Sequence, residues 1–111
     1  MSPRRLAQRE VRGAGLYDGV SERDFQRQVI DAARLLGWTV FWTYRSEHSP
    51  KGDLDLRMIR PPRILWMELK AERGKLTKEQ EATVELLQAC KAEVYVARPH
   101  EMSLVLEVLA R

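Results

Sequence analysis

Apolar residues recur at helical spacing from residue 21 onward and predict an amphipathic first helix. Ser21 is a favourable N-cap, and Gly37 is expected to end the helix. The apolar positions that share one face, three or four residues apart, are Phe25, Val29, Ala32 and Leu36. We therefore expect one side of this helix to pack against the rest of the domain.

Three segments rich in β-branched and aromatic residues follow, and their alternation predicts strands. The expected strands span residues 39–45, 54–59 and 64–71. A polar loop over 46–52 separates the first two, and the Pro61-Pro62 turn separates the second from the third. Because such short connections join antiparallel neighbours, these strands should form a meander.

A second helix is expected to start at Thr77, with Val84 and Leu87 on its inner face, before a buried strand over 94–97. Since a helix links the third and fourth strands, they should lie parallel through a right-handed crossover. A last helix follows Pro99, with an apolar stripe of Met102, Val105, Leu106 and Leu109. The expected fold class is α/β, a mixed central sheet flanked by helices in the order αβββαβ, plus a C-terminal helix.

Length and composition indicate one globular domain preceded by an arm. The chain has 111 residues, of which 44% are hydrophobic and 32% charged, as suits a single core with a charged surface. Residues 1–20 are rich in Arg and Gly and show no periodic apolar face. We expect them to form an N-terminal arm ahead of one domain over 21–111. Such an arm suits either contact with nucleic-acid phosphates or a solvated tail.

The remaining composition narrows the class of protein. A formal net charge of +3 suits an anionic partner without requiring one. Cys90 is the only cysteine, so no internal disulfide or thiolate zinc cluster is possible, and its apolar surroundings predict burial. Trp38, Trp42 and Trp66 are expected in the core and not in a base-stacking platform. No apolar run approaches the ~20 residues of a membrane span, and we expect a cytoplasmic protein.

Glu68-Leu69-Lys70 is the first candidate for chemistry. Residues two apart on a strand point to the same face, so the Glu68 carboxylate and Lys70 ammonium should project side by side. Leu69 should then point into the core. Taken by itself, the motif also fits an ordinary ion pair at a strand end.

The Gly52-x-x-Asp55 turn supplies a second carboxylate. Counting outward from the Pro61-Pro62 turn brings Asp55 opposite Glu68 or close to it. Two converging carboxylates cost stability unless a cation lies between them, and oxygen ligands suit Mg²⁺ or Mn²⁺. Such a cation can polarise a phosphodiester and activate a water, which Lys70 would orient. The alternative for Asp55 is an edge-strand carboxylate in solvent, which the combined pattern disfavours.

Other polar residues lie beside this proposed site. Gln80 shares the inward face of its helix with Val84, although Thr77-x-x-Gln80 also fits a capping box, and the two roles are compatible. Glu22 lies on the inward face of the first helix, where the helix dipole favours an acid in any case. In the preceding loop, the candidates for phosphate contacts are Arg45, His48 and Lys51. His48 also suits a third metal ligand or an ordinary exposed histidine.

These residues, in this order, resemble the VRR-NUC domain, a branch of the PD-(D/E)xK nuclease superfamily found in phage proteins and repair nucleases. The resemblance covers roughly residues 20–98 and rests on Glu22, Gly52-x-x-Asp55, Glu68-Leu69-Lys70, and Gln80 after Leu76-Thr77. It implies a restriction-endonuclease-like core in which Asp55, Glu68 and the main-chain carbonyl of Leu69 bind the metal. Lys70 would assist the attacking water, with Glu22 and Gln80 as further site residues. Leu54 stands where the family favours proline, which leaves Asp53 as a substitute ligand.

The resemblance implies a Mg²⁺- or Mn²⁺-dependent endonuclease that hydrolyses DNA and selects branched or four-way junction substrates. Standalone members resemble Holliday-junction resolvases in working as homodimers, and a phage-encoded member would act in the host cytoplasm. The apolar stripe of the last helix fits either a dimer interface or closure of the monomer core. Two alternatives are a non-catalytic nucleic-acid-binding module on a degenerate nuclease fold and a small α/β interaction domain with solvated charges. The intact Asp55, Glu68 and Lys70 argue against the first, and the order of the motifs against the second.

Overall fold

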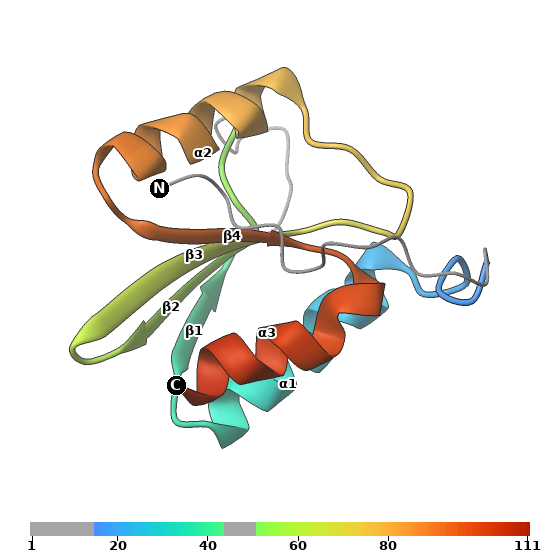
Figure 1. The fold of residues 1–111 in the computed structure, drawn as a ribbon, viewed down its shortest axis with the longest axis horizontal. Coiled ribbons are helices and arrows are strands. Elements are labelled where there is room, and N and C mark those ends of the chain that lie inside the picture. The colour runs from blue at the N-terminus through green and yellow to red at the C-terminus, as the bar shows by residue number, and fades with distance from the viewer. Residues whose placement is uncertain (1–14, 44–50) are drawn as a thin grey trace.

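The computed structural model describes residues 15–43 and 51–111 and confirms the expected mixed sheet flanked by helices (Figure 1). The elements are α1 (Glu22–Leu35), β1 (Thr39–Trp42), β2 (Leu56–Arg60), β3 (Arg63–Leu69), α2 (Lys78–Ala89), β4 (Glu93–Ala97), the 3₁₀ turn η1 (Pro99–Glu101) and α3 (Met102–Ala110). The sequence predicted the order of the helices and strands, with β2, β3 and β4 displaced by at most two residues at either end. The strand expected over 39–45 ends at Trp42, and its last two residues lie outside the described ranges.

The sheet has the strand order β1-β2-β3-β4. The pairs β1–β2 and β2–β3 are antiparallel, and β3–β4 is parallel, as the short turns and the helical crossover predicted. Helices α1 and α3 lie against one face of the sheet, and α2 lies on the other, beside β4 (Figure 1). This arrangement leaves the first residues of β2 and the last residues of β3 between the N-termini of α1 and α2.

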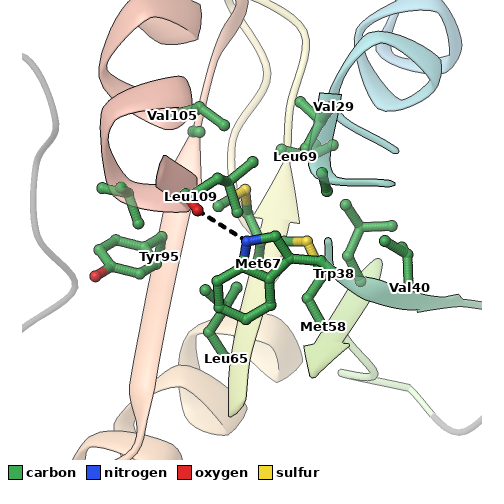
Figure 2. Close-up of a cluster of buried hydrophobic side chains, with 14 of the residues drawn as sticks. Val29, Trp38, Val40, Met58, Leu65, Met67, Leu69, Tyr95, Val105 and Leu109 are labelled. Atoms are coloured by element: carbon green, nitrogen blue, oxygen red, sulfur yellow. Dashed lines mark hydrogen bonds between the residues drawn. The ribbon is translucent and has the colours of Figure 1, made fainter. Parts of the chain in front are cut away.

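The main core fills the space between the sheet and the α1–α3 layer. Its side chains come from alternate positions of β2, β3 and β4, so Met58, Leu65 and Leu69 are fully buried (Figure 2). Trp38 closes this core, and its indole Nε1 donates a 2.9 Å hydrogen bond to the Leu109 carbonyl of α3. A smaller apolar cluster on the α2 side contains Leu54, Val84 and Val94.

The helices follow the expected caps but not every expected contact. Ser21 accepts a hydrogen bond from the Asp24 amide, so α1 begins where the sequence predicted. On its inner face, however, Ala33 is fully buried where Ala32 was expected. On α3, Leu106 is 39% exposed and Val108 is buried in its place. The remaining stripe packs against the sheet and α1, so α3 closes the monomer core.

Two side chains expected in the interior are exposed. Trp42 is 39% exposed because it lies at the end of an edge strand. Cys90 is exposed because it is the C-cap of α2, where the helix ends and the chain turns through Lys91 at φ 57°. Both predictions used local apolarity, which does not report a position at the edge of a sheet or the end of a helix.

An ion pair joins the first residues of the two parallel strands. Arg63 of β3 contacts the Glu93 carboxylate of β4, which also accepts a 2.8 Å hydrogen bond from the Tyr95 hydroxyl. Burial alone would raise the pKa of Glu93, but hydrogen bonds from Arg63 and Tyr95 outweigh it and hold this pKa below its usual value. The hydrogen bond to Glu93 likewise raises the pKa of Arg63. This half-buried cluster fixes the start of the β3–β4 ladder.

The described end of the expected arm, residues 15–20, contacts the domain. Asp18 forms a 3.1 Å ion pair with Arg73, and Tyr17 lies with its ring centroid 6.3 Å from that of His100. Val20 packs against the main core. Within the residues that the structure describes, no helix is long and apolar enough to cross a membrane.

Candidate metal centre

Asp55 and Glu68 meet where β2 begins and β3 ends. The register pairs Leu56 with Met67, so the next pair outward is Asp55 and Glu68, as counting from the turn predicted. The Asp55 amide donates a 3.0 Å hydrogen bond to Glu68 Oε1, and the Leu69 amide donates one of 2.9 Å to Asp55 Oδ2. Asp55 is 7% exposed and Glu68 fully buried. The main chain therefore holds both carboxylates in place.

Glu22 brings a third carboxylate from α1. It is the first residue of that helix, placed by the Ser21 cap over the end of the sheet. One oxygen from each of Glu22, Asp55 and Glu68 lies within 4.8 Å of the others. Three elements that are distant in the sequence thus present carboxylate oxygens to one point, which we call the carboxylate cluster.

Lys70 and Gln80 both contact the cluster through Glu68. Lys70 Nζ lies 3.3 Å from Glu68 Oε2, and Lys70 is only 5% exposed. Gln80 Nε2 donates a 3.0 Å hydrogen bond to the same oxygen. Gln80 also completes the capping box with Thr77, accepting from its amide and donating its own amide to the hydroxyl. Gln80 therefore caps α2 and contacts Glu68 at the same time, so the start of α2 is tied to the cluster.

The turn before Asp55 packs tightly against α2. Gly52 has φ +89°, and a Cβ built on it would lie 2.7 Å from the Glu79 carbonyl oxygen. Leu54 is buried in the small core on the α2 side. Asp53 is exposed, and its carboxylate accepts a 3.1 Å hydrogen bond from the Thr43 hydroxyl. The leucine thus anchors the turn by burial, and Asp55 faces the cluster while Asp53 does not.

The cluster suits a hard divalent cation. Three carboxylates this close repel one another, and a cation between them would relieve this repulsion. Oxygen ligands are those that Mg²⁺ and Mn²⁺ prefer, and one or two carboxylates with waters and a substrate phosphate are a common Mg²⁺ environment. The three carboxylates therefore fit such an ion.

For some of the predicted site residues, the proposed role is still a prediction. The Leu69 side chain is buried in the main core, as expected, while metal binding by its carbonyl stays a prediction. Arg45 and His48 lie outside the described residues, and Lys51 is exposed.

A groove that was not predicted from the sequence opens from the cluster. This groove has a volume of about 680 Å³ and lies between α1 and the end of β1. Its lining includes Glu22 and Asp55 together with Arg27, Arg34 and Trp42. The sequence does contain a pattern that indicates this surface, because the α1 residues at positions 23, 27, 30 and 34 lie on one face of the helix.

Comparison with known proteins supports the fold. No family model matches the chain, and no curated protein matches it. Among solved structures, the chain is similar to Hjc of Archaeoglobus fulgidus, a Holliday junction resolvase from an archaeal hyperthermophile. The TM-score is 0.53 at 22% sequence identity, and the match covers 68% of this chain and 66% of that one. At this identity the likeness establishes a shared fold.

Proposed function

We propose that this protein is a metal-dependent endonuclease that hydrolyses DNA phosphodiester bonds, with a preference for branched or four-way junction DNA. The observation that carries the proposal is the convergence of Glu22, Asp55 and Glu68 with Lys70 beside them. The Hjc-like fold supports the same class, since that protein is a Holliday junction resolvase. The order of motifs that resembles the VRR-NUC domain supports it independently.

The chain's own residues have distinct parts in this chemistry. Asp55 and Glu68 would hold a Mg²⁺ or Mn²⁺ ion together with Glu22 and the Leu69 carbonyl. When bound, such an ion polarises the phosphodiester and lowers the pKa of a bound water. Lys70, held within 3.3 Å of Glu68 and screened from solvent, orients the attacking water and stabilises the negative charge that develops on the phosphate. Gln80 keeps Glu68 in position through its amide.

A cleavage panel tests the proposal. Linear, flapped and four-way DNA of matched sequence are incubated with Mg²⁺, with Mn²⁺, or with a chelator. We expect cleavage only with a divalent ion, and faster cleavage of the branched substrates. Salt-sensitive binding with no cleavage under any of these conditions would instead identify the non-catalytic binding module.

We further propose that the protein acts as a C2 homodimer. One carboxylate cluster per chain can cut one strand, whereas two-fold symmetry would present two clusters to the two strands of a symmetric junction. The symmetry of the substrate is the reason to expect a dimer, because the α3 stripe closes the monomer core. Light scattering at micromolar protein should give twice the 12.9 kDa chain mass. A monomer mass there, with full activity at nanomolar enzyme, would contradict the dimer.

The finer assignment follows from the resemblance. We propose membership of the VRR-NUC branch in a standalone, phage-type form, with residues 21–111 as the nuclease domain and 1–20 as an arm. Action in the cytoplasm, or the host cytoplasm for a phage-encoded chain, belongs to the same proposal.

A further inference from the structure

The groove beside the carboxylate cluster is lined by charges of both signs. It includes three arginines and three carboxylates, namely Arg23, Arg27, Arg34, Glu22, Asp31 and Asp55. These charges balance in the protein alone. A divalent cation held by Glu22 and Asp55 would make the lining net positive, which favours a polyanion directly beside the cluster.

Trp42 gives this groove an aromatic surface. Its side chain is 39% exposed, and the Arg34 guanidinium carbon lies 5.2 Å from the ring centroid. Exposed aromatic rings and arginine planes are the surfaces on which unpaired bases stack in single-strand-binding proteins. The indole and guanidinium of this pair therefore combine a stacking surface with a phosphate-binding charge.

The pair also lies close to the proposed chemistry. Trp42 is paired with Leu56 in the β1–β2 ladder, and Asp55 directly precedes Leu56. Trp42 and Asp55 line the same groove, so a base stacked on Trp42 would belong to a nucleotide close to a phosphate at the cluster. In a continuous duplex the faces of such a base are covered by its neighbours, and stacking on the indole requires that it leave the helix.

We propose that this groove binds an unpaired nucleotide of the DNA substrate, with its base stacked on Trp42 and the flanking phosphates held by Arg27 and Arg34. The inference rests on the proposed nuclease function for the place of the phosphate at the cluster. It adds a specific requirement: the DNA has an unpaired or displaced nucleotide next to the cleaved bond, as a gap, flap or junction point provides.

Phe41 is a matched control on the same strand. It is 45% exposed and has the Arg57 guanidinium carbon 5.6 Å from its ring centroid, so it reproduces the aromatic–arginine pair. It does not line the groove, because side chains alternate along a strand and Phe41 points to the other face of the sheet. Leucine at either position keeps apolar volume and removes the aromatic face.

The test measures binding to two duplexes that differ only in a short single-stranded gap, with 2-aminopurine in the gap as a stacking probe. The wild-type chain and the variants are titrated with Ca²⁺ present, after thermal unfolding has shown that each is folded. We expect Trp42→Leu to weaken binding of gapped DNA about 10-fold and to abolish the quenching of 2-aminopurine on binding. Binding of the continuous duplex should change less than about twofold. Trp42→Phe should retain most of the affinity, and Phe41→Leu should match the wild type.

The salt dependence separates stacking from charge. Arg27→Gln should reduce the slope of log affinity against log salt by about one, whereas Trp42→Leu should leave this slope unchanged. The proposal is overturned if Trp42→Leu weakens both DNAs equally, or if Phe41→Leu has the same effect. If either result is found while the wild type cleaves DNA in Mg²⁺, the groove proposal is wrong and the nuclease function is still supported. If the chain binds gapped DNA in a Trp42-dependent way but never cleaves it, the proposed nuclease function is wrong and the groove proposal is supported.

Discussion

Asp55→Asn and Glu68→Gln should each reduce the cleavage rate about 1,000-fold or more while leaving DNA binding nearly unchanged. A catalytic metal contributes several kcal/mol of transition-state stabilisation, and ~4 kcal/mol corresponds to this factor. Affinity for DNA comes mainly from Lys and Arg contacts to phosphate, which neither change removes. Single-turnover assays measure the loss of cleavage, and Mn²⁺ titration calorimetry measures the loss of metal binding that should accompany it.

The two substitutions should differ in their effect on the free energy of unfolding. In Asp55→Asn the amide oxygen can still accept from the Leu69 amide, so we expect little change in the free energy of unfolding. In Glu68→Gln a donating amide replaces an oxygen that accepts from Gln80 and contacts Lys70, so some stability should be lost. Asp55→Asn is therefore the cleaner test.

Asp53→Asn is the matched control, since Asp53 lies two residues away, is exposed, and bonds the Thr43 hydroxyl. It should keep near-normal turnover. Near-normal turnover in Asp55→Asn, or greater harm from Asp53→Asn, would show that the ligand assignment is wrong.

The geometry of the cluster was predictable because it follows from local rules. Alternation along a strand places Glu68 and Lys70 on one face, and counting from the Pro61-Pro62 turn pairs Asp55 with Glu68. Ser21 fixes the first residue of α1, which places Glu22. Each step uses only periodicity, a cap or a turn, and all of these are visible in the chain.

The groove was not predictable on the same basis. The exposure of Trp42 depends on β1 being the edge of the sheet, which no local pattern reports. Leu106 and Cys90 were misplaced for a similar reason, because burial on a short helix depends on what packs against it. Apolarity indicates that a side chain can be buried, and only tertiary neighbours decide whether it is.

Gly52→Ala should destabilise the protein by about 3 kcal/mol and lower the cleavage rate as well, because it combines backbone strain with a steric clash. Gly52 has φ +89°, and an added Cβ would lie 2.7 Å from the Glu79 carbonyl oxygen and 2.8 Å from the Thr83 hydroxyl. Relieving this clash requires the turn and α2 to separate. Asp55 follows this turn and Gln80 lies in the first turn of α2, so the separation would also disturb the cluster.

Substitutions at two other glycines separate the cost of backbone strain from the cost of the steric clash. Gly37 has φ +90° but meets only the Arg60 side chain at 3.6 Å, so Gly37→Ala should cost about 1–2 kcal/mol, from backbone strain alone. Gly19 has nothing within 4 Å of an added Cβ, so Gly19→Ala should change stability by less than about 0.5 kcal/mol. Urea unfolding of the three variants measures these differences, and only Gly52→Ala should also slow cleavage beyond its unfolded fraction. Equal losses for Gly37→Ala and Gly52→Ala would mean that contact with α2 does not position the turn.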